Sequence, residues 1–151
     1  MKTLSSAHDL AEIRTRLDQV TALDARLWGS MTSAQMLCHL RDGFAYPLGE
    51  RDVAPVKRTP LPRPLFRWLA LRAPMKWPHG VPAPPEIDQH IGGTQPVDFE
   101  CDRAALLEKI DRFAHAAGPF GPHPLFGAIT LADWMRWGYL HCDHHLRQFG
   151  R

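Results

Sequence analysis

The sequence predicts an all-α protein, a four-helix bundle formed by a single domain over residues 1–151. Four segments repeat apolar residues with the period of an amphipathic helix, and no long segment alternates as a strand does. A chain of 151 residues with 44% hydrophobic residues also suits one compact core. A proline-rich segment, residues 47–98, separates the second predicted helix from the third.

The first predicted helix covers residues 7–20, and serines just before it can cap its start. Its apolar stripe consists of Leu10, Ile13, Leu17 and Val20. The second predicted helix covers residues 33–46. Thr32 with Gln35 three residues later has the form of a capping box, and Pro47 marks the end of the helix.

The third predicted helix covers residues 102–117 and begins at Asp102. Its apolar positions are Leu106, Leu107, Ile110, Phe113 and Ala117. The fourth covers residues 131–149 after the capping residue Thr130. Its apolar stripe is Leu131, Met135, Gly138, Cys142, Leu146 and Phe149.

The segment between the second and third helices holds eleven of the fourteen prolines, a density that excludes long helices and central strands. We expect a short helix near 64–73 and an ordered flap that packs on the bundle, over a metal site. Its stretch from Lys57 to Lys76 carries six basic residues and no acidic one. Arg67 and Arg72 are therefore candidate contacts for an anionic substrate, although a solvated basic face explains them equally well.

Histidines on two predicted helices form the candidate metal site. His141 and His145 are four residues apart, so both imidazoles lie on one face of the last helix. His39 lies at the edge of the apolar stripe of an earlier helix and supplies a third ligand. An isolated histidine in such a place is more often a hydrogen-bonded boundary residue, and the case depends on the three together.

Other residues on these faces are candidates for supporting roles. Asp42 and Gln148 each lie three residues from a proposed ligand and can orient an imidazole or a bound water. His144 is expected at the rim of the site. Tyr46 and Trp134 are candidate pocket walls, with ordinary core packing as the alternative.

The motif HLRD with His39, together with the last-helix pattern of His141, His145 and Gln148, resembles the DinB-like superfamily of helical metalloproteins, the YfiT-like group. The stretches WPHGVP, GGTQP, DFECDRAALL, HPLFG and DHHLRQFG are similar to one bacterial subfamily, a domain of unknown function, over nearly the whole chain. The resemblance implies one divalent metal bound by three histidines at one end of the bundle. Other superfamily members resemble transferases and isomerases that use bacillithiol, mycothiol or glutathione.

Three imidazoles leave coordination positions open, as in catalytic zinc sites. All-nitrogen ligands suit Zn, Ni, Cu or Fe, and we expect Zn or Ni. The resulting prediction is a metal-dependent enzyme of the thiol S-transferase or hydrolase type, acting on a small-molecule substrate and in some cases using a low-molecular-weight thiol. The alternative is a non-catalytic module whose basic, aromatic flap binds a partner or a membrane surface.

Composition limits the remaining choices. Three cysteines without CxxC spacing argue against a disulfide framework and a zinc knuckle. A formal net charge of +2 and the absence of a nucleic-acid motif indicate no nucleic-acid partner. No apolar run suits a signal peptide or a membrane span, so we expect a cytoplasmic protein. A homodimer stays open.

Overall fold

The computed structural model describes residues 1–57 and 61–151, and within these ranges it is all-α, with no β-strand. Its helices in chain order are α1 (Ala7–Asp18), α2 (Ser33–Ala45), α3 (Arg63–Leu71), the short 3-10 helix η1 (Pro85–Ile87), α4 (Phe99–Ala114) and α5 (Leu131–Gln148). The all-α prediction is confirmed.

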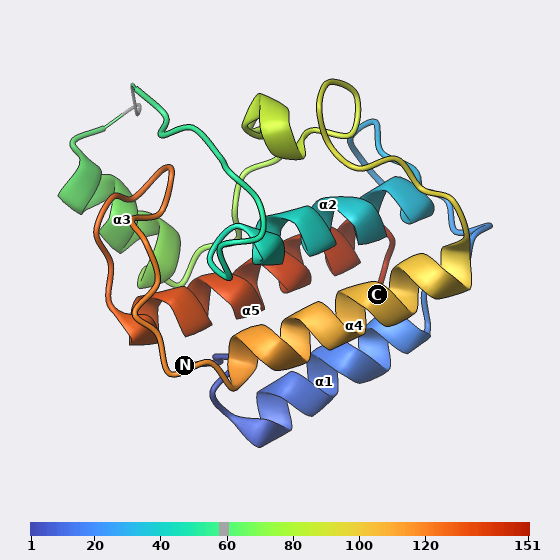
Figure 1. The fold of residues 1–151 in the computed structure, drawn as a ribbon, viewed down its shortest axis with the longest axis horizontal. Coiled ribbons are helices and arrows are strands. Elements are labelled where there is room, and N and C mark those ends of the chain that lie inside the picture. The colour runs from blue at the N-terminus through green and yellow to red at the C-terminus, as the bar shows by residue number, and fades with distance from the viewer. Residues whose placement is uncertain (58–60) are drawn as a thin grey trace.

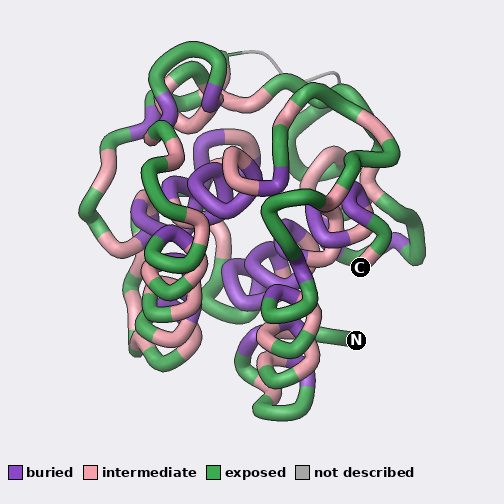
Figure 2. Tube along the Cα trace, turned by 90° about the vertical axis from the view of Figure 1, so that its right-hand side faces the viewer, coloured by how far each residue is buried: buried purple, intermediate pink, exposed green. Residues whose placement is uncertain are grey.

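The four long helices contact one another in a closed ring, in which α2 contacts α4, α4 contacts α1, α1 contacts α5 and α5 contacts α2. Figure 1 shows these helices side by side, with α3 near the start of α5. Figure 2 shows that buried residues gather on the inward sides of the helices. Fully buried members of this common core include Ile13, Leu17, Leu40, Phe44, Ile110 and Phe113.

Local capping explains where most helices begin. Thr32 and Gln35 form the predicted capping box at the start of α2. Ser6 caps α1 and Thr130 caps α5, in each case by accepting from the backbone N–H three residues later. The ends of α1 and α5 lie within two residues of the predicted ends.

The predicted third helix, residues 102–117, is displaced by three residues, since α4 begins at Phe99 and ends at Ala114. Asp98 caps it by accepting from the Cys101 N–H. Asp102 is instead buried, where it accepts hydrogen bonds from the Val97 N–H and the Arg41 guanidinium. The predicted core position Leu131 is also wrong, since this first residue of α5 is 42% exposed.

The segment between α2 and α4 packs against the long helices. Leu71 and Val53 are buried, and Phe66 and Trp77 pack against the core from the same segment. Its short helix, α3, begins at Arg63, one residue before the predicted start, and ends two residues early. Residues 58–60, part of the predicted basic stretch, lie outside the described residues. No helix of the described residues is long and apolar enough to cross a membrane.

Candidate metal centre

The structure brings His39 of α2 together with His141 and His145 of α5. All three are buried, and one nitrogen of each lies within 4.8 Å of the corresponding nitrogens of the others. The Nε2 atoms of His39 and His141 are 3.1 Å apart. Two nitrogens bound to one tetrahedral zinc at 2.0–2.1 Å would be about 3.3 Å apart, so this spacing fits a shared metal ion.

The partner of His39 Nδ1 determines which of its nitrogens is free to bind. His39 Nδ1 lies 2.7 Å from the carbonyl oxygen of Ile87. Because a carbonyl oxygen can only accept, Nδ1 carries the hydrogen and donates it. Nε2 therefore keeps its lone pair and faces His141.

Gln148 determines the same choice for His145. Its Nε2 donates to the carbonyl oxygen of Trp28 at 2.8 Å, which turns Oε1 toward His145 Nδ1 at 3.1 Å. Nδ1 of His145 is thus the donor, and Nε2 is left for a ligand. His141 Nδ1, in contrast, is buried without a hydrogen-bond partner.

Burial keeps these imidazoles neutral at physiological pH. Desolvation lowers the pKa of His39, and it lowers the pKa of His141 and of His145 well below the ordinary value. At His39 the hydrogen bond to Ile87 opposes this shift. Neutral imidazole is the form that binds metal ions, so the three side chains are ready to do so near neutral pH.

A glycine makes the close approach of the two helices at the site feasible. Gly43 follows His39 by one turn of α2, and a Cβ atom there would lie 2.9 Å from Cε1 of His141. A larger residue would therefore displace the imidazole ring. Glycine is unfavourable within a helix, and this close contact with His141 explains why it nevertheless occupies position 43.

The three histidines open onto a cavity of about 520 Å³. Its walls are mainly apolar and come from α2, α3, α5 and the loops around residues 28–31, 75–90 and 123–126. They include Trp28, Met31, Phe66, Trp77, Phe126 and Trp137. A volume of this size accommodates a small organic molecule, and the apolar walls favour a substrate with an apolar part.

The predicted pocket residues Tyr46, Trp134 and His144 all line this cavity. Tyr46 also donates its hydroxyl hydrogen to the Pro122 carbonyl oxygen, and Trp134 is almost completely buried. Trp134 therefore combines a wall position with the packing role considered above. Burial lowers the pKa of His144 to about 4, so this ring is neutral at pH 7 and is a weak base.

The structure places Arg67 and Arg72 elsewhere. Arg67 donates to the carbonyl oxygen of Ala128, and Arg72 pairs with Asp133 near the start of α5. Neither is among the described residues that line the cavity, where Lys76 is the cationic side chain. The basic flap residues thus attach α3 to the protein, and the sequence pattern did not single out Lys76 among six cations.

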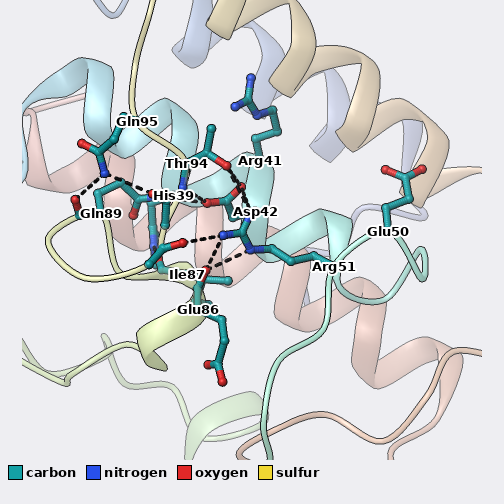
Figure 3. Close-up of polar contacts among 12 residues, drawn as sticks. His39, Arg41, Asp42, Glu50, Arg51, Glu86, Ile87, Gln89, Thr94 and Gln95 are labelled. Carbon is teal, nitrogen blue, oxygen red and sulfur yellow. Dashed lines mark hydrogen bonds and ion pairs between the residues drawn. The ribbon is translucent and has the colours of Figure 1, made fainter.

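Asp42 lies on α2 one turn beyond His39, but its carboxylate hydrogen-bonds to the proline-rich segment and to no imidazole. It accepts from Gln89, Thr94 and Arg51, as Figure 3 shows. The hydrogen-bond partner of His39 is instead the Ile87 carbonyl oxygen. A backbone oxygen carries no sequence signature, so this contact was out of reach from the sequence.

The cysteines take no part in the centre. Cys38 and Cys142 are buried neighbours of the ligands, and all three cysteines are free thiols. Burial raises the pKa of Cys38 to about 11 and raises that of Cys142 further. Both therefore stay protonated at neutral pH and are poor metal ligands and nucleophiles.

Comparison with known proteins identifies a family but no activity. The family model described as "Protein of unknown function (DUF1569)" matches residues 3–151. Neither a curated protein nor a solved structure is significantly similar to the chain. Since the match spans nearly all of its residues, the chain belongs to the DUF1569 family of proteins of unknown function.

Proposed function

We propose that this protein binds one divalent metal ion through His39, His141 and His145 and uses it in a thiol S-transferase or hydrolase reaction. The observation that carries the proposal is the convergence of three buried imidazoles, two of which have Nδ1 already engaged, at the wall of an apolar cavity. Convergence of neutral imidazoles with hydrogen-bonded Nδ1 atoms is the usual form of a metal site. Zn or Ni is the metal we propose.

The closed ring of four helices, with three histidines from its second and last members, supports a four-helix bundle of the DinB-like type. In that arrangement the proline-rich segment is an insertion that closes one side of the site. Its Trp77 ring lies 6.3 Å from the His141 ring and 5.9 Å from the His144 ring, measured between centroids. The segment therefore contributes walls of the cavity and shields the imidazoles from water.

A metal bound at this position would supply Lewis-acid chemistry that activates a water molecule or a thiol. The chain itself binds the apolar part of the substrate, excludes bulk water through its aromatic walls and keeps the three imidazoles neutral. Lys76 at the cavity wall offers a counter-charge for an anionic group of a substrate or a cofactor thiol. His144, neutral and at the wall, adds an uncharged polar group to the cavity.

The first experiment is elemental analysis of untagged protein, combined with thermal unfolding at increasing Zn or Ni concentration. We expect about one metal per chain and, at a hundredfold excess over Kd, a stabilisation of about 2.7 kcal/mol. For a chain of this length that corresponds to a rise in Tm of about 5–11 °C. His141→Ala with His145→Ala should abolish both, whereas His115→Ala, an exposed histidine outside the candidate metal groups of the described residues, serves as the control.

A second assay distinguishes the transferase from the hydrolase. A protein that binds metal is assayed with an apolar electrophile and with an apolar ester, each with and without a low-molecular-weight thiol. Turnover that needs the thiol indicates the transferase, and turnover without it indicates the hydrolase. No metal and no thermal shift in the wild type would refute the metal site.

A non-catalytic binding module is the second candidate function, and one observation favours it. Leu65 and Trp68 on α3 are 47% and 55% exposed, so this helix presents apolar side chains outward as interfacial helices do. The hydrogen bonds of Arg67 and Arg72 within the protein argue against this candidate, because those guanidinium groups are already engaged. A metal-free protein that binds partners or vesicles through α3 would favour this candidate.

A further inference from the structure

A buried carboxylate on α2 collects hydrogen bonds from the loop formed by residues 85–95. Asp42 is 3% exposed and accepts from the Thr94 N–H at 2.7 Å, the Thr94 hydroxyl at 2.7 Å and Gln89 Nε2 at 3.0 Å. Arg51 adds a fourth hydrogen bond at 3.0 Å. The loop is therefore attached to the same helix that carries His39, as Figure 3 shows.

Arg51 also holds the backbone of the same loop at two points. Its Nε and one terminal nitrogen donate to the Glu86 carbonyl oxygen at 2.9 and 2.6 Å, and that terminal nitrogen also donates to the Gly92 carbonyl oxygen at 2.8 Å. The planar guanidinium thus links Asp42 to both ends of the loop's turn. A side chain with several fixed donors restricts position and orientation together, which a lysine could not do.

The loop transmits this restriction to the metal site. Ile87, whose carbonyl oxygen accepts from His39 Nδ1, directly follows the Glu86 that Arg51 holds. The turn from Ile87 to Thr94 is tightly packed, because a Cβ atom at Gly93 would lie 2.5 Å from Gln89 Nε2. The Arg51 contacts therefore restrict the position of the Ile87 carbonyl oxygen.

We infer that Arg51 and Asp42 are positioning residues for the metal centre, which hold the Ile87 carbonyl oxygen on His39 and so direct His39 Nε2 toward the other two histidines. This inference rests on the proposed metal function. Groups that orient a ligand imidazole typically change metal affinity by 10–100-fold when they are lost. Neither residue contacts a reacting atom, so both act through His39.

The same helix offers a closely matched control. Arg41 pairs with Asp102 at 3.1 Å, as Arg51 pairs with Asp42 at 3.0 Å. The arginine side chains are 22% and 24% exposed, and the carboxylate side chains 7% and 4%. Removal of either arginine leaves a buried carboxylate without its ion-pair partner. Only the Arg51 pair connects to a proposed ligand, so only removal of Arg51 also tests positioning.

The experiment compares the wild type with Arg51→Met and Arg41→Met. Zn affinity is measured by competition with a chelator, stability by urea unfolding, and the His39 tautomer by 15N NMR of the metal-free protein. We expect both variants to lose stability. Arg51→Met should bind Zn 10–100-fold more weakly and lose the uniform Nδ1–H tautomer of His39, and Arg41→Met should retain both within twofold.

Equal Zn affinity in the two variants, with an unchanged His39 tautomer in Arg51→Met, would overturn the inference. If the wild type binds no Zn, the proposed function fails, and the tautomer measurement still decides whether Arg51 positions His39. Should Arg51→Met not fold, Thr94→Val replaces it, because it removes one donor to Asp42 and preserves side-chain volume. A Thr94→Val protein with wild-type affinity and tautomer would count equally against the inference.

Discussion

Replacement of Gly43 by alanine separates the metal site from the stability of the helix that carries it. The new Cβ atom would lie 2.9 Å from Cε1 and 3.3 Å from Nδ1 of His141, whereas ordinary contacts begin near 3.4 Å. The imidazole must therefore retreat by about half an ångström. Gly43 and His39 share a face of α2, so the retreat carries His141 away from His39.

A displacement of this size exceeds what metal coordination tolerates, since metal-to-ligand distances hold within about 0.2 Å. We expect Zn affinity to fall at least about tenfold, equivalent to about 1.4 kcal/mol. Alanine is also favoured over glycine within a helix by about 1 kcal/mol, which offsets the strain at His141. The metal-free variant should thus unfold at nearly the urea concentration of the wild type.

The assay is a chelator competition for Zn, paired with urea unfolding of the metal-free proteins. Gly121→Ala is the control, because a Cβ atom there meets nothing within 4 Å. It should leave both quantities unchanged. A Gly43→Ala protein with wild-type Zn affinity would refute the reasoning, because it would show that His141 does not bind metal from its position against α2.

Two further predictions concern the environment of the imidazoles. Gln148→Leu removes the acceptor of His145 Nδ1 and should weaken Zn binding about 10–100-fold by competition titration, and an unchanged Kd would contradict the assigned tautomer. Burial lowers the pKa of His123 to about 3. Below about pH 6.5 the unfolded chain takes up a proton that the folded metal-free protein does not. The free energy of unfolding therefore decreases as the pH is lowered. Between pH 7 and pH 5 His123 alone should cost about 2 kcal/mol, with the buried ligand histidines adding to the loss, and a flat urea profile over that range would be inconsistent with neutral buried imidazoles.

Helix positions were largely predictable because their determinants are local. The capping box of Thr32 and Gln35 lies within four residues, and a helical period is visible within two turns. The start of α4 could not be assigned in this way. Asp98 and Asp102 both precede apolar residues at helical spacing, and the ion pair of Asp102 with Arg41 on a different helix removes it from the capping role.

The histidines of the candidate site were predictable for a similar reason. His141 and His145 share a helical face by their spacing alone, and His39 lies at the edge of an apolar stripe. Their convergence on one point, however, depends on how α2 and α5 pack. The predicted anion contacts show the limit of composition, since Arg67 and Arg72 are bonded within the protein and Lys76 lies at the cavity.

The sequence by itself determined the helical class, the caps and the faces on which the histidines lie, because these follow from interactions over three or four residues. Tertiary structure alone decided which nitrogen of His39 is free. The Ile87 carbonyl oxygen lies 48 residues from His39, and the Arg51 and Asp42 contacts that hold its loop depend on how the segment folds back onto α2. Backbone acceptors are the same at every position, so only the fold can select one of them.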